Sequence, residues 1–330
     1  MQAVILAAGK STRTYPLTIN KPKPLLKIGN KTLLEYNLDQ LNGLVKEVIL
    51  IVGFKANSIK KQFKKRYKKL KISYVLQKPQ LGTGHALAVA KNKIKNKFIV
   101  LMADDLYSRN DIKKCIKHKY SVLAKKVKDP SRFGVYTVKN GFVTDLVEKP
   151  KKPVSNLANT ALYVLDKEIF NELKKIKRSP RGEYELTDSV RALAKKEKVK
   201  CVAAKQWISV GYPWNLFDVK KLFRIKGNSI GKNCKIKGKV INSIIMDNSI
   251  IEKGSIVKDS IIGEGVYFKG KIESKSNVIS IIKNKKIKVL KLGAIIGDKV
   301  TAKNVIIQPG TLIWPNIKKK NKKLKGVVKK

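Results

Sequence analysis

The sequence contains few cysteines and no long apolar run, and each absence narrows what the chain can be. Its three cysteines, Cys115, Cys201 and Cys234, lie far apart and are odd in number. We therefore expect neither a disulfide framework nor a zinc site. No stretch reaches the roughly 18 apolar residues of a transmembrane helix, and Met1–Ala8 is too short and uncharged for a signal peptide. These absences predict a cytoplasmic protein without a membrane span.

Acidic residues are also scarce. Only 23 Asp and Glu stand against 74 Lys and Arg in 330 residues, which gives a formal charge of +51. Cations gathered on one face would indicate nucleic-acid binding. Here they are mostly lysines spread over every segment, which is typical of a chain-wide compositional bias. We expect attraction of anionic substrates but no specific nucleic-acid partner.

From residue 1 to about residue 224, short β-rich runs alternate with helical patterns. This alternation predicts an α/β domain with a mostly parallel sheet. Strands are predicted at Gln2–Leu6, Glu47–Val52, Ile72–Leu76 and Phe98–Met102, and helices near Thr32–Leu41, Asn57–Tyr67 and Thr83–Lys91. Ligands of such sheets bind beyond the carboxyl ends of the strands. The loop after the first strand and the segments after Leu76 and Met102 should therefore share one edge.

Beyond Arg224 the pattern changes to a period of six. Apolar residues recur at Ile244, Ile250, Ile256, Ile262 and Phe268, and then at Val300, Ile306 and Leu312; an apolar–glycine pair recurs at Ile230-Gly231, Ile262-Gly263 and Ile296-Gly297. Hexapeptide periodicity is typical of a parallel β-helix, in which short coils stack into one core. Residues 269–293 interrupt the period and should loop out. We divide the chain into 1–224, a β-helix at 225–316, and a basic tail at 317–330 that we expect to be disordered.

The loop after the first strand has the composition of an anion-binding segment. It reads Leu6-Ala7-Ala8-Gly9-Lys10-Ser11-Thr12-Arg13 and continues to Lys23-Pro24-Leu25. Small residues let backbone N–H groups approach a phosphate closely, although neither a Walker A loop nor a GxGxxG motif is present. Arg13 offers a rigid fork of donors and Lys23 a mobile charge. An ordinary loop with solvated basic residues is the alternative from spacing alone.

This pattern, LAAGxSTR…PLT…KPKPLL, resembles the signature of the sugar-1-phosphate nucleotidylyltransferases of the two-domain type. The resemblance implies a Rossmann-like nucleotidyltransferase domain followed by a left-handed β-helix. It assigns catalytic charge neutralisation to Arg13 and Lys23. Nucleotide contacts are implied for Leu6, Ala8 and Gly9.

The segment Gln77–His85 is the second signal. It ends a predicted strand with a primary amide and opens a helix through Gly-Thr-Gly. An amide can pair with a pyrimidine edge, and Gly82 would let a base approach the backbone; a plain helix-capping turn is the alternative. The segment resembles the base-recognition segment of uridylyl- and thymidylyltransferases, which implies nucleotide contacts for Gln77, Gly82 and Thr83. His85 is expected to be structural.

Asp104 and Asp105 follow an apolar run, where a carboxylate can bind Mg²⁺. In the family a Gly-Asp pair holds the catalytic magnesium; here an alanine replaces the glycine, and the resemblance assigns the metal to Asp104. The segment Trp207–Trp214 resembles the closing motif W-x-D-V-G-x-P-W, whose aspartate is the second metal ligand. Ser209 occupies that position. A metal at Asp104 would therefore need additional water or phosphate oxygens.

Four further segments match the family in its order along the chain, and the resemblance implies that they bind the sugar phosphate. A glycine whose backbone contacts the sugar, the glutamate and lysine of an EKP motif, a sugar-contacting asparagine and an arginine near the phosphate correspond to Gly134, Glu148, Lys149, Asn159 and Arg181. An alanine stands two residues after the asparagine, where glycine is common.

The resemblance implies a Mg²⁺-dependent enzyme. The ionised oxygen of a sugar 1-phosphate attacks the α-phosphorus of a nucleoside triphosphate and pyrophosphate leaves, so catalysis is positioning and charge neutralisation. Gln77 and Gly82 favour UTP or dTTP. The resemblance of the motif QxxQLGTGHA favours uridylyl transfer to N-acetylglucosamine 1-phosphate. A non-catalytic or regulatory relative of the same two-domain plan is the second hypothesis. Ser209 favours it mildly, and the retained cations and Asp104 disfavour it.

The β-helix of two-domain relatives often carries acetyltransferase activity, which needs a histidine base. The two histidines of this chain, His85 and His118, lie in the first domain. The family's acceptor turn is also absent near residues 265–273. We expect a structural or oligomerising β-helix without acetyl transfer, and a homo-oligomer formed through it.

Overall fold

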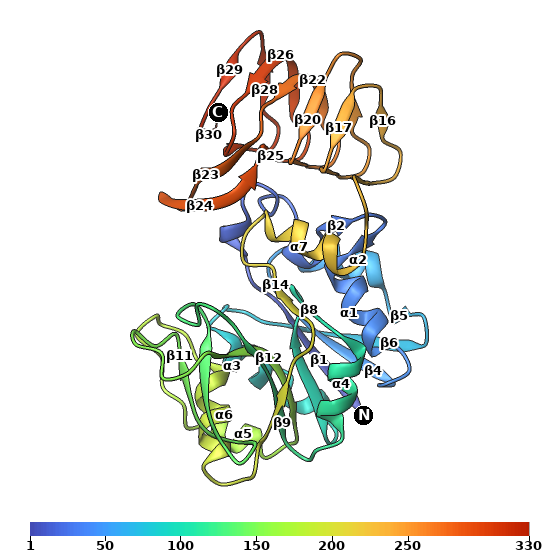
Figure 1. Cartoon of the computed structure of the whole chain (residues 1–330). Helices are drawn as coiled ribbons and strands as arrows, with labels where there is room; N and C mark the ends of the chain where they lie inside the picture. The colour runs from blue at the N-terminus through green and yellow to red at the C-terminus, as the bar shows by residue number, and fades with distance from the viewer. Residues whose placement is uncertain (330) are drawn as a thin grey trace. The chain divides into compact units, whose positions relative to one another are not determined.

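The structure is a computed structural model that describes residues 1–329, and Figure 1 shows its elements. Residue contacts divide the chain into two compact units. Unit 1 comprises Met1–Gly9 and Leu34–Ser209, and unit 2 comprises Lys10–Leu33 and the chain from Val210 onward. The loop at 10–33 thus belongs to the same unit as the C-terminal strands. The predicted division near residue 224 instead placed this loop in the first domain. Among residues 1–329, no helix is long and apolar enough to span a membrane.

A ten-stranded sheet with the order β10-β11-β13-β9-β12-β7-β1-β4-β6-β5 lies in unit 1. Its strands are β1 (Gln2–Ala7), β4 (Glu47–Val52), β5 (Arg66–Tyr67), β6 (Leu70–Leu76), β7 (Phe98–Met102), β9 (Ser121–Lys126), β10 (Gly134–Lys139), β11 (Phe142–Glu148), β12 (Leu157–Leu165) and β13 (Lys200–Ala203). The strands β7-β1-β4-β6 run parallel. Most pairings in the other half are antiparallel, so the sheet is mixed rather than parallel throughout.

The parallel strands form because their side chains are apolar on both faces. β1 is buried at every position, and β4 is buried from Val48 to Val52. A strand that is covered on both sides needs such a continuous apolar run. The four strands predicted in this region are confirmed. The helices are α1 (Leu33–Leu41), α2 (Ala56–Phe63), α3 (Thr83–Ala88), α4 (Arg109–Ile116), α5 (Ile169–Leu173), α6 (Leu186–Ala194) and α7 (Asn215–Leu222), with 3₁₀ turns η1 (Thr12–Thr14), η2 (Lys23–Leu25) and η3 (Lys91–Lys93).

The helix predicted for Asn57–Tyr67 is wrong in its last turn. α2 ends at Phe63, and Lys64 has a φ of 49° and a ψ of −135°, a conformation outside the helical region in which a helix cannot continue. Arg66–Tyr67 instead pair with β6 as the short antiparallel strand β5. The periodicity alone did not reveal this turn because a lysine at the break carries no turn signal.

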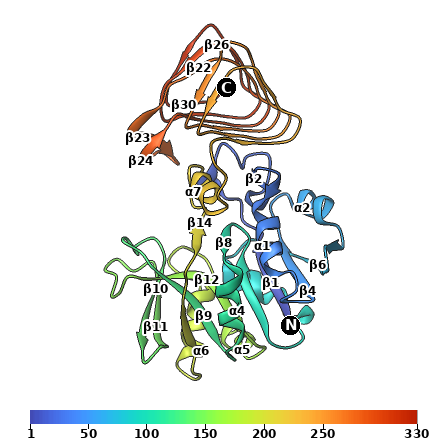
Figure 2. The same cartoon turned by 45° about the vertical axis from the view of Figure 1, so that its right-hand side comes forward.

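The coils of unit 2 form a parallel β-helix with three faces, and Figure 2 shows their triangular outline. One face consists of β15 (Ser229–Ile230), β18 (Ile244–Ile245), β21 (Ile261–Ile262), β25 (Ala294–Ile296), β27 (Thr311–Ile313) and β30 (Val327–Val328). The other two contain β16 (Lys235–Ile236), β17 (Lys239–Ile241), β19 (Ile250–Ile251), β20 (Ile256–Lys258), β28 (Lys318–Lys320) and β29 (Lys323–Leu324), joined by the longer β22 (Tyr267–Ile272) and β26 (Thr301–Ile307), each of which contributes to both. The predicted β-helix is confirmed.

The six-residue period is correct, but its phase differs at several positions. Ile251 and Val257 are fully buried, whereas the predicted Ile250 and Ile256 are half-buried and Ile306 is 44% exposed. Adjacent isoleucines made both phases possible from sequence. The apolar–glycine pairs have a different cause: a Cβ on Gly263 would lie 2.7 Å from a backbone carbon of the glycine on the next coil.

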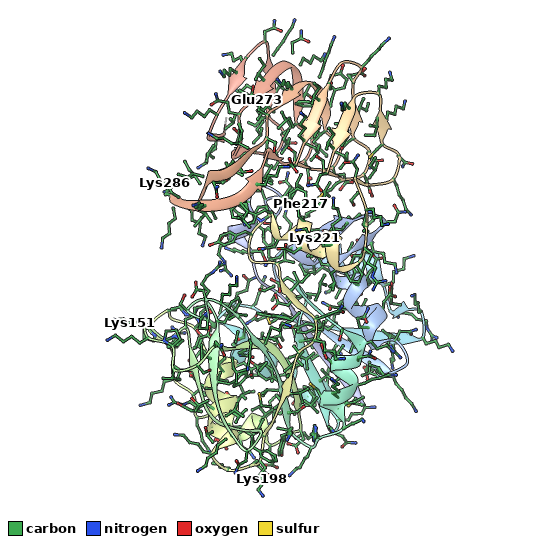
Figure 3. All side chains as sticks on the ribbon, in the orientation of Figure 1. Lys151, Lys198, Phe217, Lys221, Glu273 and Lys286 are labelled. Atoms are coloured by element: carbon green, nitrogen blue, oxygen red, sulfur yellow. The ribbon has the colours of Figure 1, made fainter. Side chains whose placement is uncertain are left out.

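The interruption of the period and the C-terminal lysine-rich segment both bear on the predictions. The excursion expected at 269–293 is a hairpin of β23 (Lys275–Ile282) and β24 (Lys285–Leu292), from which Lys286 projects in Figure 3. The expectation of a disordered tail is wrong for residues 317–329. There β28, β29 and β30 complete another coil, because Ile317 and Leu324 supply the buried apolar positions between the lysines.

Two short antiparallel pairs complete the fold. β2 (Lys27–Ile28) pairs with β3 (Lys31–Thr32) in unit 2, and β8 (Asp105–Tyr107) pairs with β14 (Trp207–Ser209) in unit 1. Lysines such as Lys151 and Lys198 project from the surface of unit 1 in Figure 3. Their spread over many elements agrees with a compositional bias rather than a single basic stripe.

Candidate active site

The carboxyl ends of the parallel strands in unit 1 bring the predicted nucleotide segments together. The Ala103 N–H donates to the Leu6 carbonyl at 3.1 Å, and the Phe54 N–H donates to the Ala8 carbonyl at 3.0 Å. The Gln77 N–H donates to the carbonyl of Val52, the last residue of β4, at 2.8 Å. The ends of β1, β4, β6 and β7 therefore lie side by side. This confirms the edge that the sequence predicts.

Gln77 is held by its own segment. Its side chain is buried, and its amide nitrogen donates to the Gly82 carbonyl at 3.0 Å and lies 3.2 Å from Nδ1 of His85. The imidazole therefore helps to orient the amide. Gln77, Gly82 and His85 thus form one hydrogen-bonded group at the start of α3, and a structural role for His85 stays a prediction.

The glycines of this segment are required by a neighbouring loop. Gly82 has a φ of 103°, and a Cβ there would lie 2.6 Å from the Tyr184 carbonyl. Tyr184 pairs with the segment through two backbone bonds: its N–H donates to Leu81 at 2.8 Å and its carbonyl accepts from Gly84 at 2.7 Å. The Thr83 hydroxyl accepts from the Leu186 N–H at 3.1 Å, at the start of α6. The loop that carries Arg181 is thus attached to the predicted base segment.

Gly134, Glu148 and Asn159 converge as the sequence predicts. Gly134 lies opposite Glu148 in the β10–β11 pair. A Cβ on Gly134 would lie 3.1 Å from Glu148 Oε2 and 3.2 Å from Asn159 Cβ. Only glycine leaves the backbone accessible between these two side chains.

Two tyrosines that sequence reasoning missed fix the orientation of the Asn159 amide. The Tyr136 hydroxyl donates to Asn159 Oδ1 at 2.8 Å, and the Ala161 N–H donates to the same oxygen at 2.8 Å. Asn159 Nδ2 donates to the Tyr163 hydroxyl at 2.6 Å. Burial raises the pKa of both tyrosines, so both remain protonated. Ala161 has a φ of 55°, which explains why glycine is common at this position in the family.

Arg181 is ion-paired with two carboxylates. Its Nη2 lies 3.2 Å from Glu148 Oε1 and 2.6 Å from Glu185 Oε1, and Lys149 Nζ lies 3.1 Å from the same Glu148 oxygen. Burial alone would lower the pKa of Arg181, but the two carboxylates outweigh it and raise this pKa. Burial raises the pKa of Glu185, with Arg181 opposing it. Glu185 was not singled out from the sequence, although it lies in the matched stretch.

Ser209 ends β14, and Asp104 is the residue before β8, the strand with which β14 pairs. Ser209 lies opposite Asp105 in this pair. The Asp105 carboxylate is buried and accepts from Trp207 Nε1 at 3.1 Å. Asp105 therefore supports β14 from inside the protein. Asp104 is the more exposed of the two.

These residues fit Mg²⁺ held largely by substrate oxygens and water. Within residues 1–329, no group of three or more His, Cys, Asp or Glu side chains is placed to hold a metal ion. Mg²⁺ commonly uses one or two carboxylates together with substrate phosphates. Asp104 with a neighbouring hydroxyl meets that requirement, whereas an all-protein cage is not present in the described chain.

Arg13 and Lys23 belong to unit 2 and differ in burial. Arg13 is exposed in η1. Lys23 is 5% exposed, and its ammonium donates to the Val210 carbonyl at 2.7 Å. Val210 is the residue that follows Ser209 in the closing motif.

Comparison with known proteins agrees with these features. Residues 2–224 match the family described as "Nucleotidyl transferase". The "Bifunctional protein GlmU" of Methanocaldococcus jannaschii is 35% identical over 381 residues, which cover 96% of this chain and 92% of that protein. The "Bifunctional sugar-1-phosphate nucleotidylyltransferase/acetyltransferase" of Sulfurisphaera tokodaii is 33% identical over 361 residues, covering 100% of this chain and 86% of that one.

A solved structure is similar in fold. It is titled as UDP-glucose pyrophosphorylase complexed with UDP-glucose, and it matches with a TM-score of 0.62 at 25% identity, covering 68% of this chain and 98% of that one. The alignment with the Methanocaldococcus protein is longer than the 330 residues of this chain. That relative therefore contains segments without a counterpart here.

Proposed function

We propose, since this chain belongs to the nucleotidyl transferase family, that it transfers a uridylyl group from UTP to a sugar 1-phosphate in the cytoplasm and releases pyrophosphate. The first sugar to test is N-acetylglucosamine 1-phosphate, with dTTP as the alternative triphosphate. One observation carries the proposal. The segment of Gln77 and Gly82 is hydrogen-bonded to the loop of Arg181, which is ion-paired with Glu148. This linkage supports the proposal because it joins the residues predicted to bind the base to those predicted to bind the sugar phosphate.

The proposed mechanism needs no side-chain nucleophile, because the attacking phosphate oxygen is already ionised. Arg13 and Lys23 neutralise charge on the phosphates, as preorganised cations do where charge develops. Asp104 would hold Mg²⁺ with help from Ser209, and the bound ion would supply further charge neutralisation. These residues act by position, so small displacements of them should cost rate.

The sugar is bound by the Gly134, Glu148 and Asn159 group in this proposal. Glu148 would accept hydrogen bonds from sugar hydroxyls, and Lys149 would contact a phosphate. Because Asn159 Oδ1 already accepts two hydrogen bonds, the amide nitrogen is the atom that it offers to the sugar. Asn159 would thus recognise an acceptor oxygen on the ligand.

A non-catalytic relative remains the second candidate because Ser209 replaces the second carboxylate. We further propose that the β-helix mediates self-association without acetyl transfer, because both histidines lie outside residues 210–330. The name of the Sulfurisphaera relative includes an acetyltransferase, which makes this a useful contrast. Detectable N-acetylation of glucosamine phosphate by the pure protein would overturn that part.

A matrix of four triphosphates and several sugar 1-phosphates tests the main proposal. Pyrophosphate release is measured with and without Mg²⁺. We expect release only when UTP or dTTP, a sugar 1-phosphate and Mg²⁺ are all present. Binding of a sugar nucleotide with no turnover in any combination would instead support the non-catalytic reading.

A further inference from the structure

One corner of the β-helix carries a row of carboxylates. Asp247, Glu264 and Asp298 each lie two residues after stacked isoleucines of the first face, on three successive coils. Acidic residues are rare in this chain, with 23 in 330. Three like charges on neighbouring coils repel one another, so the row needs cations from elsewhere in unit 2.

The loop at 10–33 supplies these cations. Lys21 Nζ lies 2.9 Å from Glu264 Oε2 and 3.0 Å from Asp298 Oδ2, and Lys27 is ion-paired with Asp247. The Lys21 side chain is 16% exposed. Burial alone would lower the pKa of Lys21, but Asp298 and Glu264 outweigh it and raise this pKa. Lys21 therefore stays charged.

The two aspartates are themselves held by the coils. Asp247 Oδ1 accepts from the Lys232 N–H at 3.0 Å, and Asp298 Oδ1 accepts from the Glu264 N–H at 2.9 Å. In each case Oδ2 is the oxygen that faces a lysine of the loop. Each carboxylate thus links the backbone of the β-helix to the loop.

The loop, which includes β2, follows this corner across five successive strands of the first face, and Figure 2 shows it next to the coils. The Gly29 N–H donates to the Ser229 hydroxyl at 2.7 Å in β15. Lys27 and Lys21 follow on the next coils. The ring of Tyr15 then packs edge to face against Trp314, the residue after β27, with the ring centroids 6.3 Å apart. Lys23 lies between the two anchored lysines.

We propose that this corner of the β-helix positions the loop for nucleotidyl transfer, and that Asp247 and Asp298 are positioning residues for Lys23 and Arg13. This inference rests on the proposed function. It gives the β-helix a part in the nucleotidyl transfer itself, through side chains that do not touch substrate. Displacement of such a loop by about 1 Å is enough to lower rates on the order of 10²-fold.

The test compares the Asp247→Asn/Asp298→Asn double variant with Asp259→Asn. Asp259 is a buried carboxylate of the same β-helix whose partners, Asn242, Ser274 and Lys291, all lie outside the loop. We expect kcat/KM for the triphosphate to fall by roughly 10-fold to 100-fold in the double variant and to stay unchanged in Asp259→Asn. Lys27→Met should be non-additive with Asp247→Asn, because the two residues share one ion pair.

Amide hydrogen exchange of residues 10–33 gives a second readout that needs no activity. Exchange should be faster in the double variant and unchanged in Asp259→Asn. The inference is overturned if the double variant matches Asp259→Asn in both exchange and kcat/KM. It is also overturned if exchange in the double variant is faster but kcat/KM is unchanged. If the wild-type protein transfers no nucleotidyl group with any substrate pair, the proposed function fails and this positioning role fails with it, while exchange still shows whether the corner anchors the loop.

Discussion

Ser209 lies directly opposite Asp105 in the β8–β14 pair, one residue along from Asp104. The Asp105 carboxylate accepts from Trp207 Nε1 and is 8% exposed. It is therefore held away from the role of a substitute metal ligand. If Asp104 holds Mg²⁺ as proposed, position 209 is where a second carboxylate could be added.

Ser209→Asp should tighten the Mg²⁺ requirement and leave or raise kcat, because it adds a second carboxylate to the site. Asp104→Asn should abolish activity, because the proposed site has no second carboxylate to hold the metal in its place. A Mg²⁺ titration of pyrophosphate release measures both. The competing hypothesis is that Asp105, or Asp218 of α7, replaces the missing ligand. The prediction is wrong if Ser209→Asp leaves the Mg²⁺ dependence untouched while Asp105→Asn or Asp218→Asn weakens it.

Arg13→Ala should lower turnover by a factor on the order of 10² or more, as expected when a preorganised charge-stabilising donor is lost. Arg66→Ala is a suitable control, because Arg66 is an equally exposed arginine in β5 of unit 1. Single-turnover rates at saturating triphosphate separate chemistry from binding. Equal rates in the two variants would remove Arg13 from the mechanism.

Tyr136→Phe should raise KM for the sugar 1-phosphate several-fold while KM for the triphosphate stays constant. The change removes one of the two hydrogen bonds that orient Asn159 Oδ1, at a cost of about 1 kcal/mol. Tyr120→Phe is the matched control, since Tyr120 is also buried but donates to Asp166 at 2.6 Å, outside this group. A parallel rise of both KM values would argue for a general structural effect instead.

Asp259→Asn should lower the free energy of unfolding by about 1–2 kcal/mol at neutral pH. Burial alone would raise the pKa of Asp259, but hydrogen bonds from Ser274, Asn242 and Lys291 outweigh it and lower this pKa. A carboxyl group whose pKa is lowered by folding stabilises the protein at every pH above its unfolded pKa of 3.8. This contribution is lost as the pH falls through the folded pKa. The gap between wild type and variant should therefore shrink in urea unfolding below about pH 4. A gap that stays constant from pH 7 to pH 3 would contradict this account.

Sequence reasoning succeeded where one residue pattern has one structural outcome. The apolar run of β1 can be buried only in a covered strand, and the period of six indicates stacked coils. The sequence could not show which of two adjacent isoleucines, such as Ile250 and Ile251, faces the core, because both positions satisfy the period. The candidate site residues were predicted from family motifs, and the structure brings Gly134, Glu148 and Asn159 close together.

Partners outside those motifs could not be predicted. Tyr136 lies in an ordinary strand pattern, and only the fold shows that its hydroxyl meets Asn159. Which of the many lysines would pair with Asp247 or Asp298 is equally invisible in a chain with 74 cations. Long-range ion pairs depend on which distant segments the fold brings together. In a chain with so many lysines, the sequence does not show which lysine takes part.

The contact of the loop with the β-helix also bears on how the protein is made. Lys21 and Glu264 are separated by 243 residues in sequence, and domains generally fold from the N-terminus during synthesis. The sheet strands of the first 102 residues can pair while the ribosome is still translating, but the loop cannot meet its carboxylates until the coils after residue 247 exist. Contacts of such long sequence separation form slowly. The loop at 10–33 is thus among the earliest segments to be translated and among the last to be anchored, so a prematurely terminated chain would contain it without its anchors.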